Sequence, residues 1–64
     1  MIERFEYLGI EIGIQEFMAP NGPVYSAYFT LADREFHTYL NDDLSFIKHI
    51  AQDMISAFRH GQRN

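Results

Sequence analysis

The fold is decided by the stretch Val24-Tyr25-Ser26-Ala27-Tyr28-Phe29-Thr30-Leu31, which alternates between two kinds of side chain along its whole length. Its odd positions are all apolar or aromatic, whereas its even positions include two hydroxyl residues. Successive side chains of a β-strand point to opposite faces of a sheet. The stretch is therefore predicted to be a strand whose odd positions face a core.

A similar alternation runs from Leu8 to Ile14, with every even position apolar. We expect a first strand over about residues 5–18, joined to the strand at 24–31 through a turn rich in Pro and Gly. Pro23 has no N–H to close a two-residue hairpin, so a longer, bulged loop is expected. If the core residues of both strands share a face, opposed residue numbers must sum to an odd value, and 41 and 43 both remain open.

A third strand is predicted over about residues 35–40, after the polar turn 32–35. A tight turn at Asp33-Arg34 would place Tyr28 directly opposite Tyr39. The core side of the predicted sheet then comprises Leu8, Ile10, Ile12, Ile14, Ala27, Phe29, Leu31, Phe36 and Leu40.

A helix is predicted over about residues 43–60, because the capping cluster Asn41-Asp42-Asp43 precedes a segment of helical periodicity. Ile47, Ala51, Met54 and Phe58 fall on one line of this helix, flanked by Leu44, Ile50 and Ile55. Gly61 suits the C′ position, and residues 62–64 are expected to fray. The predicted fold class is α+β, a single domain over residues 1–64 with a three-stranded antiparallel β-meander and one C-terminal helix (β-β-β-α).

Size and composition bound the function of the chain. It has 64 residues, 47% of them hydrophobic and 16% aromatic, and no Cys, so dense packing or self-association must stabilise it. A formal net charge of −4 disfavours nucleic acid and anionic lipid as partners. No apolar run approaches the roughly 18 residues of a membrane span, and the N-terminus lacks the pattern of a leader. We therefore expect a cytoplasmic protein that does not bind membranes.

One helix covers one face of the predicted sheet, so the other face should be exposed. Phe5 is expected there, and Tyr28 should lie over or near Gly13. Several aromatic side chains on one face of a small domain favour a contact surface over the alternative, local stabilisation of the sheet. The predicted protein-binding residues are Tyr7, Phe17, Val24, Tyr28, His37 and Tyr39.

Catalytic, cofactor and metal sites are not predicted. The serines stand in no nucleophile motif, and no Gly-rich loop precedes the helix to hold phosphate. His49 and Asp53 have the i, i+4 spacing of two metal ligands on a helix, but His60 lies about 16 Å further along the axis. A solvated helix face explains these three side chains better than a metal site does.

These features predict a small non-catalytic protein-binding module, a homodimer that acts as a regulator or inhibitor by occupying a partner protein's surface. Phages and mobile elements encode many small acidic proteins of this kind. The alternatives are a nucleic-acid-binding regulator and an acidic mimic of nucleic acid. The order of three strands and a helix is similar to that of some DNA-binding domains, including the arm-binding domains of phage integrases, but no motif matches and the charge opposes it.

Overall fold

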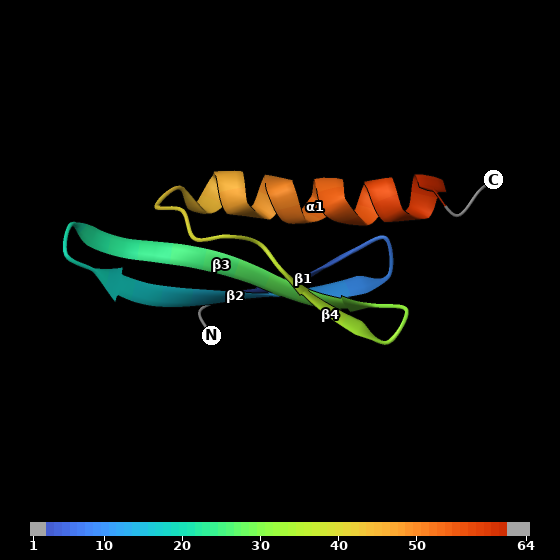
Figure 1. Ribbon diagram of the computed structural model, residues 1–64, viewed down its shortest axis with the longest axis horizontal. Coiled ribbons are helices and arrows are strands. Elements are labelled where there is room, and N and C mark those ends of the chain that lie inside the picture. The colour runs from blue at the N-terminus through green and yellow to red at the C-terminus, as the bar shows by residue number, and fades with distance from the viewer. Residues whose placement is uncertain (1–2, 62–64) are drawn as a thin grey trace.

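The protein, described by a computed structural model over residues 3–61, is a four-stranded antiparallel sheet followed by one helix. Its elements are β1 (Glu3–Tyr7), β2 (Ile10–Ala19), β3 (Gly22–Leu31), β4 (Arg34–His37) and α1 (Leu44–Gly61). The strands lie in the sheet in the order of the chain, and α1 forms a second layer on one side (Figure 1). The predicted α+β meander with a C-terminal helix is confirmed, with four strands in place of three.

The additional strand arises at Leu8-Gly9, where the predicted first strand turns back on itself. Leu8 has a φ of 51° and Gly9 a φ of 80°, the backbone of a tight two-residue hairpin turn. The alternation of apolar residues at even positions begins at Leu8 itself, so the pattern places Leu8 in the strand and conceals the turn. Leu8 was predicted to lie in the core and is instead 48% exposed.

The turn at Leu8-Gly9 also decides which face β1 presents to α1. It pairs Phe5 with Ile12 and Tyr7 with Ile10. Directly opposed residues of antiparallel strands share a face, so Phe5 and Tyr7 lie on the face covered by α1. Their predicted place on the opposite face is wrong. The prediction assumed one continuous strand over residues 5–18, in which the odd positions 5 and 7 would face away from Ile10 and Ile12.

The pairing of β2 with β3 follows one of the two predicted registers. Gly13 lies opposite Tyr28 and Ile14 opposite Ala27, so opposed residue numbers sum to 41. The connection is a two-residue turn closed by Ala19 and Gly22, and the expected longer loop is wrong. Pro23 pairs with Met18 at the next position. Residue pairs of an antiparallel ladder alternate between hydrogen-bonded and non-hydrogen-bonded, and at this non-hydrogen-bonded pair Pro23 needs no N–H toward β2.

A third two-residue turn, at Ala32-Asp33, joins β3 to β4. Both residues have positive φ, 50° and 64°, and the turn is one residue earlier than predicted. Tyr28 consequently lies opposite His37, and the predicted pairing with Tyr39 is wrong.

Beyond β4 the chain stays beside β3 with one extra residue. Thr38 donates its N–H to the carbonyl of Ala27 at 2.9 Å, and Asn41 donates its N–H to the carbonyl of Tyr25 at 3.1 Å. Tyr39 and Leu40 therefore both stand opposite Ser26, as in a β-bulge. Tyr39 is 70% exposed and Leu40, predicted to be core, is also exposed.

Helix α1 begins as predicted. The carboxylate of Asp43 accepts the N–H of Phe46 at 3.2 Å, and the amide oxygen of Asn41 accepts the N–H of Asp43 at 2.8 Å. The helix ends at Gly61, which is its last residue and has no positive φ, so the predicted C′ role is wrong. Residues 62–64, predicted to fray, lie outside the described residues.

The core lies between α1 and one face of the sheet. Its buried members are Ile12, Ile14, Ala27, Phe29, Leu31, Ile47, Ala51 and Ile55. Ile10, Phe36, Met54 and Phe58, all predicted to be core, pack against it and are partly buried. The buried line of α1, which we call the helical seam, therefore runs through Ile47, Ala51 and Ile55. The sequence pattern had placed Ile55 on the flank of this line. No helix within residues 3–61 is both long and apolar enough to span a membrane.

Candidate functional site

The sheet face opposite α1 carries no second layer within the described residues (Figure 1). We call it the uncovered face. The strand registers assign to it Arg4, Glu6, Glu11, Gly13, Gln15, Phe17, Val24, Ser26, Tyr28, Thr30, Glu35 and His37.

Four of the predicted protein-binding residues share the uncovered face. Phe17 lies opposite Val24, and Tyr28 lies opposite His37. Tyr7 is on the other face, where its hydroxyl is 2.8 Å from Oγ of Ser56 in α1. Tyr39 lies outside β4 in the bulged segment. Of the six predicted residues, four therefore form two cross-strand pairs on the uncovered face, and Tyr7 and Tyr39 lie elsewhere.

Tyr28 occupies the middle of the uncovered face. Its ring lies over Gly13, where a Cβ atom would overlap the ring. The ring of His37 is beside it, with ring centroids 6.3 Å apart and planes inclined by 34°. The predicted contact of Tyr28 with Gly13 is confirmed, and it depends on the missing side chain of the glycine.

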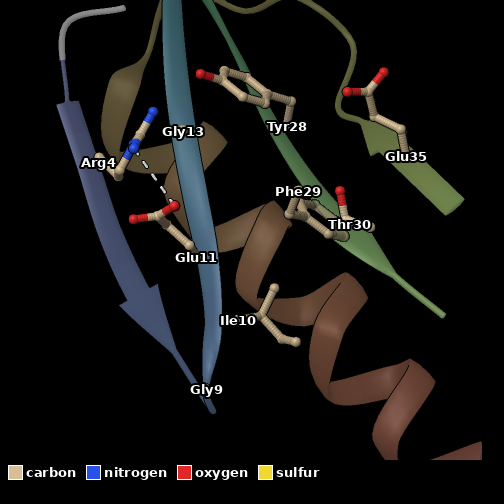
Figure 2. Close-up of a pocket in the computed structure, with 9 residues that line it drawn as sticks. All are labelled: Arg4, Gly9, Ile10, Glu11, Gly13, Tyr28, Phe29, Thr30 and Glu35. Carbon is tan, nitrogen blue, oxygen red and sulfur yellow. Dashed lines mark ion pairs between the residues drawn. The ribbon is translucent and has the colours of Figure 1, made fainter. Parts of the chain in front are cut away.

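A hollow of about 340 Å³ opens beside Tyr28 (Figure 2). It is lined by Arg4, Gly9, Ile10, Glu11, Gly13, Tyr28, Phe29, Thr30 and Glu35. The carboxylate of Glu11 is 3.6 Å from the guanidinium of Arg4 across one side of the hollow, and Glu35 extends from β4 on the other. The hollow is a small depression lined by both polar and apolar groups, with an aromatic wall.

Acidic side chains gather at the end of the uncovered face near the β1–β2 and β3–β4 turns. Glu6 lies directly opposite Glu11, and Glu35 lies directly opposite Thr30. Like charges placed opposite each other in a sheet are destabilising. The strand registers therefore bring these three carboxylates, from three different strands, to one end of one surface.

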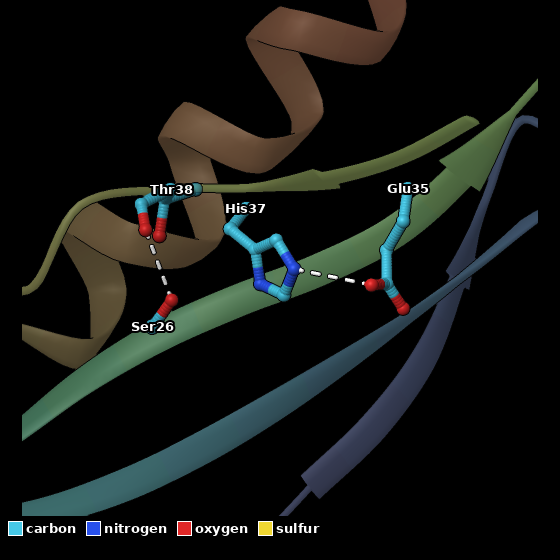
Figure 3. A network of polar contacts seen from close by, with 4 residues as sticks. All are labelled: Ser26, Glu35, His37 and Thr38. Atoms are coloured by element: carbon cyan, nitrogen blue, oxygen red, sulfur yellow. Dashed lines mark hydrogen bonds and ion pairs between the residues drawn. The ribbon is translucent and has the colours of Figure 1, made fainter.

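A buried polar contact fixes the segment that follows β4 (Figure 3). Ser26 Oγ donates to the carbonyl of Thr38 at 2.9 Å, and Thr38 Oγ1 accepts the N–H of Ala27 at 2.9 Å. Both side chains are buried. His37, on the uncovered face, has Nε2 3.4 Å from Oε1 of Glu35. Thr38 thus fixes the segment after β4 to β3. It was not among the residues predicted to bind protein.

The β2–β3 hairpin extends beyond the rest of the sheet as an arm, residues 15–24 (Figure 1). Among described residues, the β1–β2 ladder ends at the Glu3–Ile14 pair, so the arm has two strands. Phe17 on the uncovered face is 46% exposed, and Met18 on the other face is 78% exposed. Leu40 lies against the tip of the arm, where a hollow of about 330 Å³ is formed with residues 19–24. Sequence alternation did not single out Met18 or Leu40 as exposed.

The basic side chains of the described chain are mostly engaged elsewhere. Lys48 Nζ is 2.5 Å from Oε2 of Glu3, and Arg59 Nη2 donates to the carbonyl of Leu8 at 2.5 Å. Nε2 of His49 lies 3.2 Å from Oδ2 of Asp53, and both side chains are exposed. Residues 3–61 hold no group of three or more side chains suited to a metal ion.

The uncovered face, with the arm at one end and the acidic residues at the other, is the candidate functional site. Comparison of the chain with protein-family models, with curated proteins and with solved structures found no match. The site is therefore defined by geometry and charge.

Proposed function

We propose that the chain is a small non-catalytic protein-binding module, a regulator or inhibitor that occupies the surface of a partner protein through the uncovered face. The observation that carries the proposal is a sheet with a helix on one face and, on the other, the exposed Phe17 with the half-buried Val24 and Tyr28. A sheet face with such side chains is stabilised when another layer covers it.

Apolar burial supplies the driving force for this contact. Phe17 and Val24 form an apolar pair near the tip of the arm, and the ring of Tyr28 stands at the centre of the face. Fully burying an apolar side chain of this size is worth about 1.5–3 kcal/mol. Tyrosine is enriched among the residues that dominate binding energies, because its ring is large and loses little conformational entropy.

Charge favours protein over nucleic acid as the partner. The uncovered face presents Glu6, Glu11 and Glu35, and its one guanidinium, that of Arg4, is beside Glu11. Binding to a phosphate backbone requires free basic side chains that release counterions. The carboxylates would instead repel phosphate, which disfavours the nucleic-acid-binding alternative. Three carboxylates are also few for a mimic of a phosphate backbone.

The proposal includes self-association into a homodimer through the arm. Phe17 and Met18 expose apolar surface on its two faces, and Leu40 adds to it at the tip. A chain of 64 residues has a small core, and joining two arms about a two-fold axis would enlarge the buried apolar surface. Sedimentation equilibrium should give twice the monomer mass for the parent chain, and a monomer mass at all concentrations would contradict this part of the proposal.

Partner recovery with matched variants tests the proposed function. Phe17→Ser removes a phenylalanine from the uncovered face, and Phe46→Ser removes the same side chain from an exposed position of α1. Tagged parent and variant chains are incubated with extract of the native host, and bound protein is quantified by mass spectrometry. Because only Phe17 lies on the proposed surface, a protein retained by the parent should be lost from Phe17→Ser and kept by Phe46→Ser. Retention by both variants, with both folded by circular dichroism, would contradict the proposal.

A further inference from the structure

We infer that the hollow beside Tyr28 receives a basic side chain of the partner protein, an arginine or lysine in a segment that lies along the uncovered face. This inference rests on the proposed function and adds the chemistry of the partner.

The charge of the hollow is complementary to a cation. Glu11 and Glu35 line it from β2 and β4, and Glu6 stands opposite Glu11 on β1. Two carboxylates in directly opposed positions repel each other, and one guanidinium, that of Arg4, offsets this within the sheet. That pair is more than half exposed, and exposed pairs are worth only about 0–1 kcal/mol. An incoming cation can therefore share or displace Arg4 at little cost.

One wall of the hollow suits a planar cation. It is formed by the ring of Tyr28, which lies over Gly13. A guanidinium can stack on an aromatic ring while it donates two hydrogen bonds to a carboxylate. A lysine can make the charge contact without this stacking. Arginine is consequently the preferred occupant.

The spacing of the face constrains the rest of the partner segment. Glu11 and Phe17 lie six residues apart on β2, about 20 Å at about 3.3 Å per residue. A partner that uses both ends of the face must present a basic and an apolar side chain at that separation. An extended segment spans it in about six residues, and a helix in about 13.

Titration of ¹⁵N-labelled protein with hexa-arginine tests the inference. Amide shifts should saturate and map to Glu11, Gly13, Tyr28 and Glu35, with weaker binding at high salt. Hexalysine should bind more weakly than hexa-arginine, and hexaglutamate should leave these signals unchanged.

A pair of glutamates on β2 provides the matched control. Glu11→Gln removes a carboxylate from the hollow, whereas Glu16→Gln removes one from the other face of the same strand, with the same change in net charge. Glu11→Gln should weaken hexa-arginine binding by about 5-fold or more, and Glu16→Gln by less than about 2-fold, because close charge pairs contribute more than distant ones. Equal weakening by the two variants, or shifts that map to α1, would overturn the inference.

The outcomes separate this inference from the proposed function. If hexa-arginine fails to bind the hollow while Phe17→Ser still abolishes partner recovery, the inferred basic side chain is wrong. The proposal that the uncovered face binds a partner is then still supported. If Phe17→Ser retains the partner while hexa-arginine maps to the hollow, the proposed use of the whole face is wrong.

Discussion

The ring of Tyr28 lies over the backbone of Gly13 across the β2–β3 ladder, in a space that only glycine leaves free. This contact fills the middle of an otherwise uncovered sheet face and forms one wall of the hollow beside it. Sheet stability and the shape of the candidate site therefore depend on the same pair of residues.

The Tyr28–Gly13 contact predicts that Gly13→Ala destabilises the fold by about 1–3 kcal/mol, the usual cost of overpacking. The added methyl group would force the ring away from the sheet. The same substitution in a Tyr28→Ser background should be close to neutral, because the obstacle is gone. Urea denaturation of the four chains of this double-mutant cycle measures the coupling. Equal costs in both backgrounds would mean that the ring does not rest on Gly13.

A second prediction tests the register of β1. Tyr7→Phe removes the hydrogen bond to Ser56 and should lower the free energy of unfolding by about 0.5–1.5 kcal/mol. Tyr39→Phe is the control, because Tyr39 is exposed and should tolerate the change with no measurable effect. Indistinguishable stabilities for the two variants would indicate that β1 does not turn Tyr7 toward α1.

The helical seam gives a third prediction. Ile55 is fully buried between α1 and the sheet, so Ile55→Ala should cost about 2–5 kcal/mol and can unfold a domain this small. Ile50→Ala, the same substitution at a partly buried position of α1, should cost less. If chemical denaturation shows a larger loss of stability for Ile50→Ala than for Ile55→Ala, the helical seam does not run through Ile55.

The buried hydroxyl of Thr38 gives a fourth prediction. Thr38→Val keeps the shape of the side chain but leaves the N–H of Ala27 without its acceptor, which should cost about 1–3 kcal/mol. Thr30→Val, at an exposed position of β3, should change the stability by less than about 0.5 kcal/mol. A Thr38→Val protein as stable as the parent would show that this hydrogen bond is absent in solution.

Much of the fold could be predicted because its signals are local. The odd positions of residues 24–31 do face the core, except for the partial exposure of Tyr25. The capping residues before α1 do cap it, and the spacing of Ile47 and Ala51 identifies its buried side. Alternation and helical periodicity report directly on which side chains are buried.

The errors in strand pairing share one cause, the position of a tight turn. Leu8-Gly9 and Ala32-Asp33 lack the Asn-Gly or Asp-Gly pair that usually marks a two-residue hairpin, and Leu8 also starts the alternation that marks β2. A turn displaced by one residue changes every pairing beyond it. Phe5 and Tyr7 therefore lie on the face opposite to the predicted one, and Tyr28 pairs with His37 instead of Tyr39.

The candidate site could be predicted only in part for the same reason. Phe17, Val24 and Tyr28 depend on the β2–β3 register, whose sum was expected to be 41 or 43, and both sums place them on the uncovered face. The acidic end depends on the β1–β2 and β3–β4 registers, which bring Glu6 and Glu35 to the face that holds Glu11. No local pattern in the sequence indicates that meeting.

Selective protection of one histidine tests the central claim, that the uncovered face is the contact surface, most directly. His37 on that face and His49 on the solvent side of α1 each pair with a carboxylate, and their side chains are 53% and 69% exposed. Diethyl pyrocarbonate modifies exposed histidines, and mass spectrometry measures the rate at each site with the chain free and with its partner bound. We predict that binding slows the modification of His37 several-fold and leaves the rate at His49 unchanged. Protection of His49 with an unchanged rate at His37 would contradict the account.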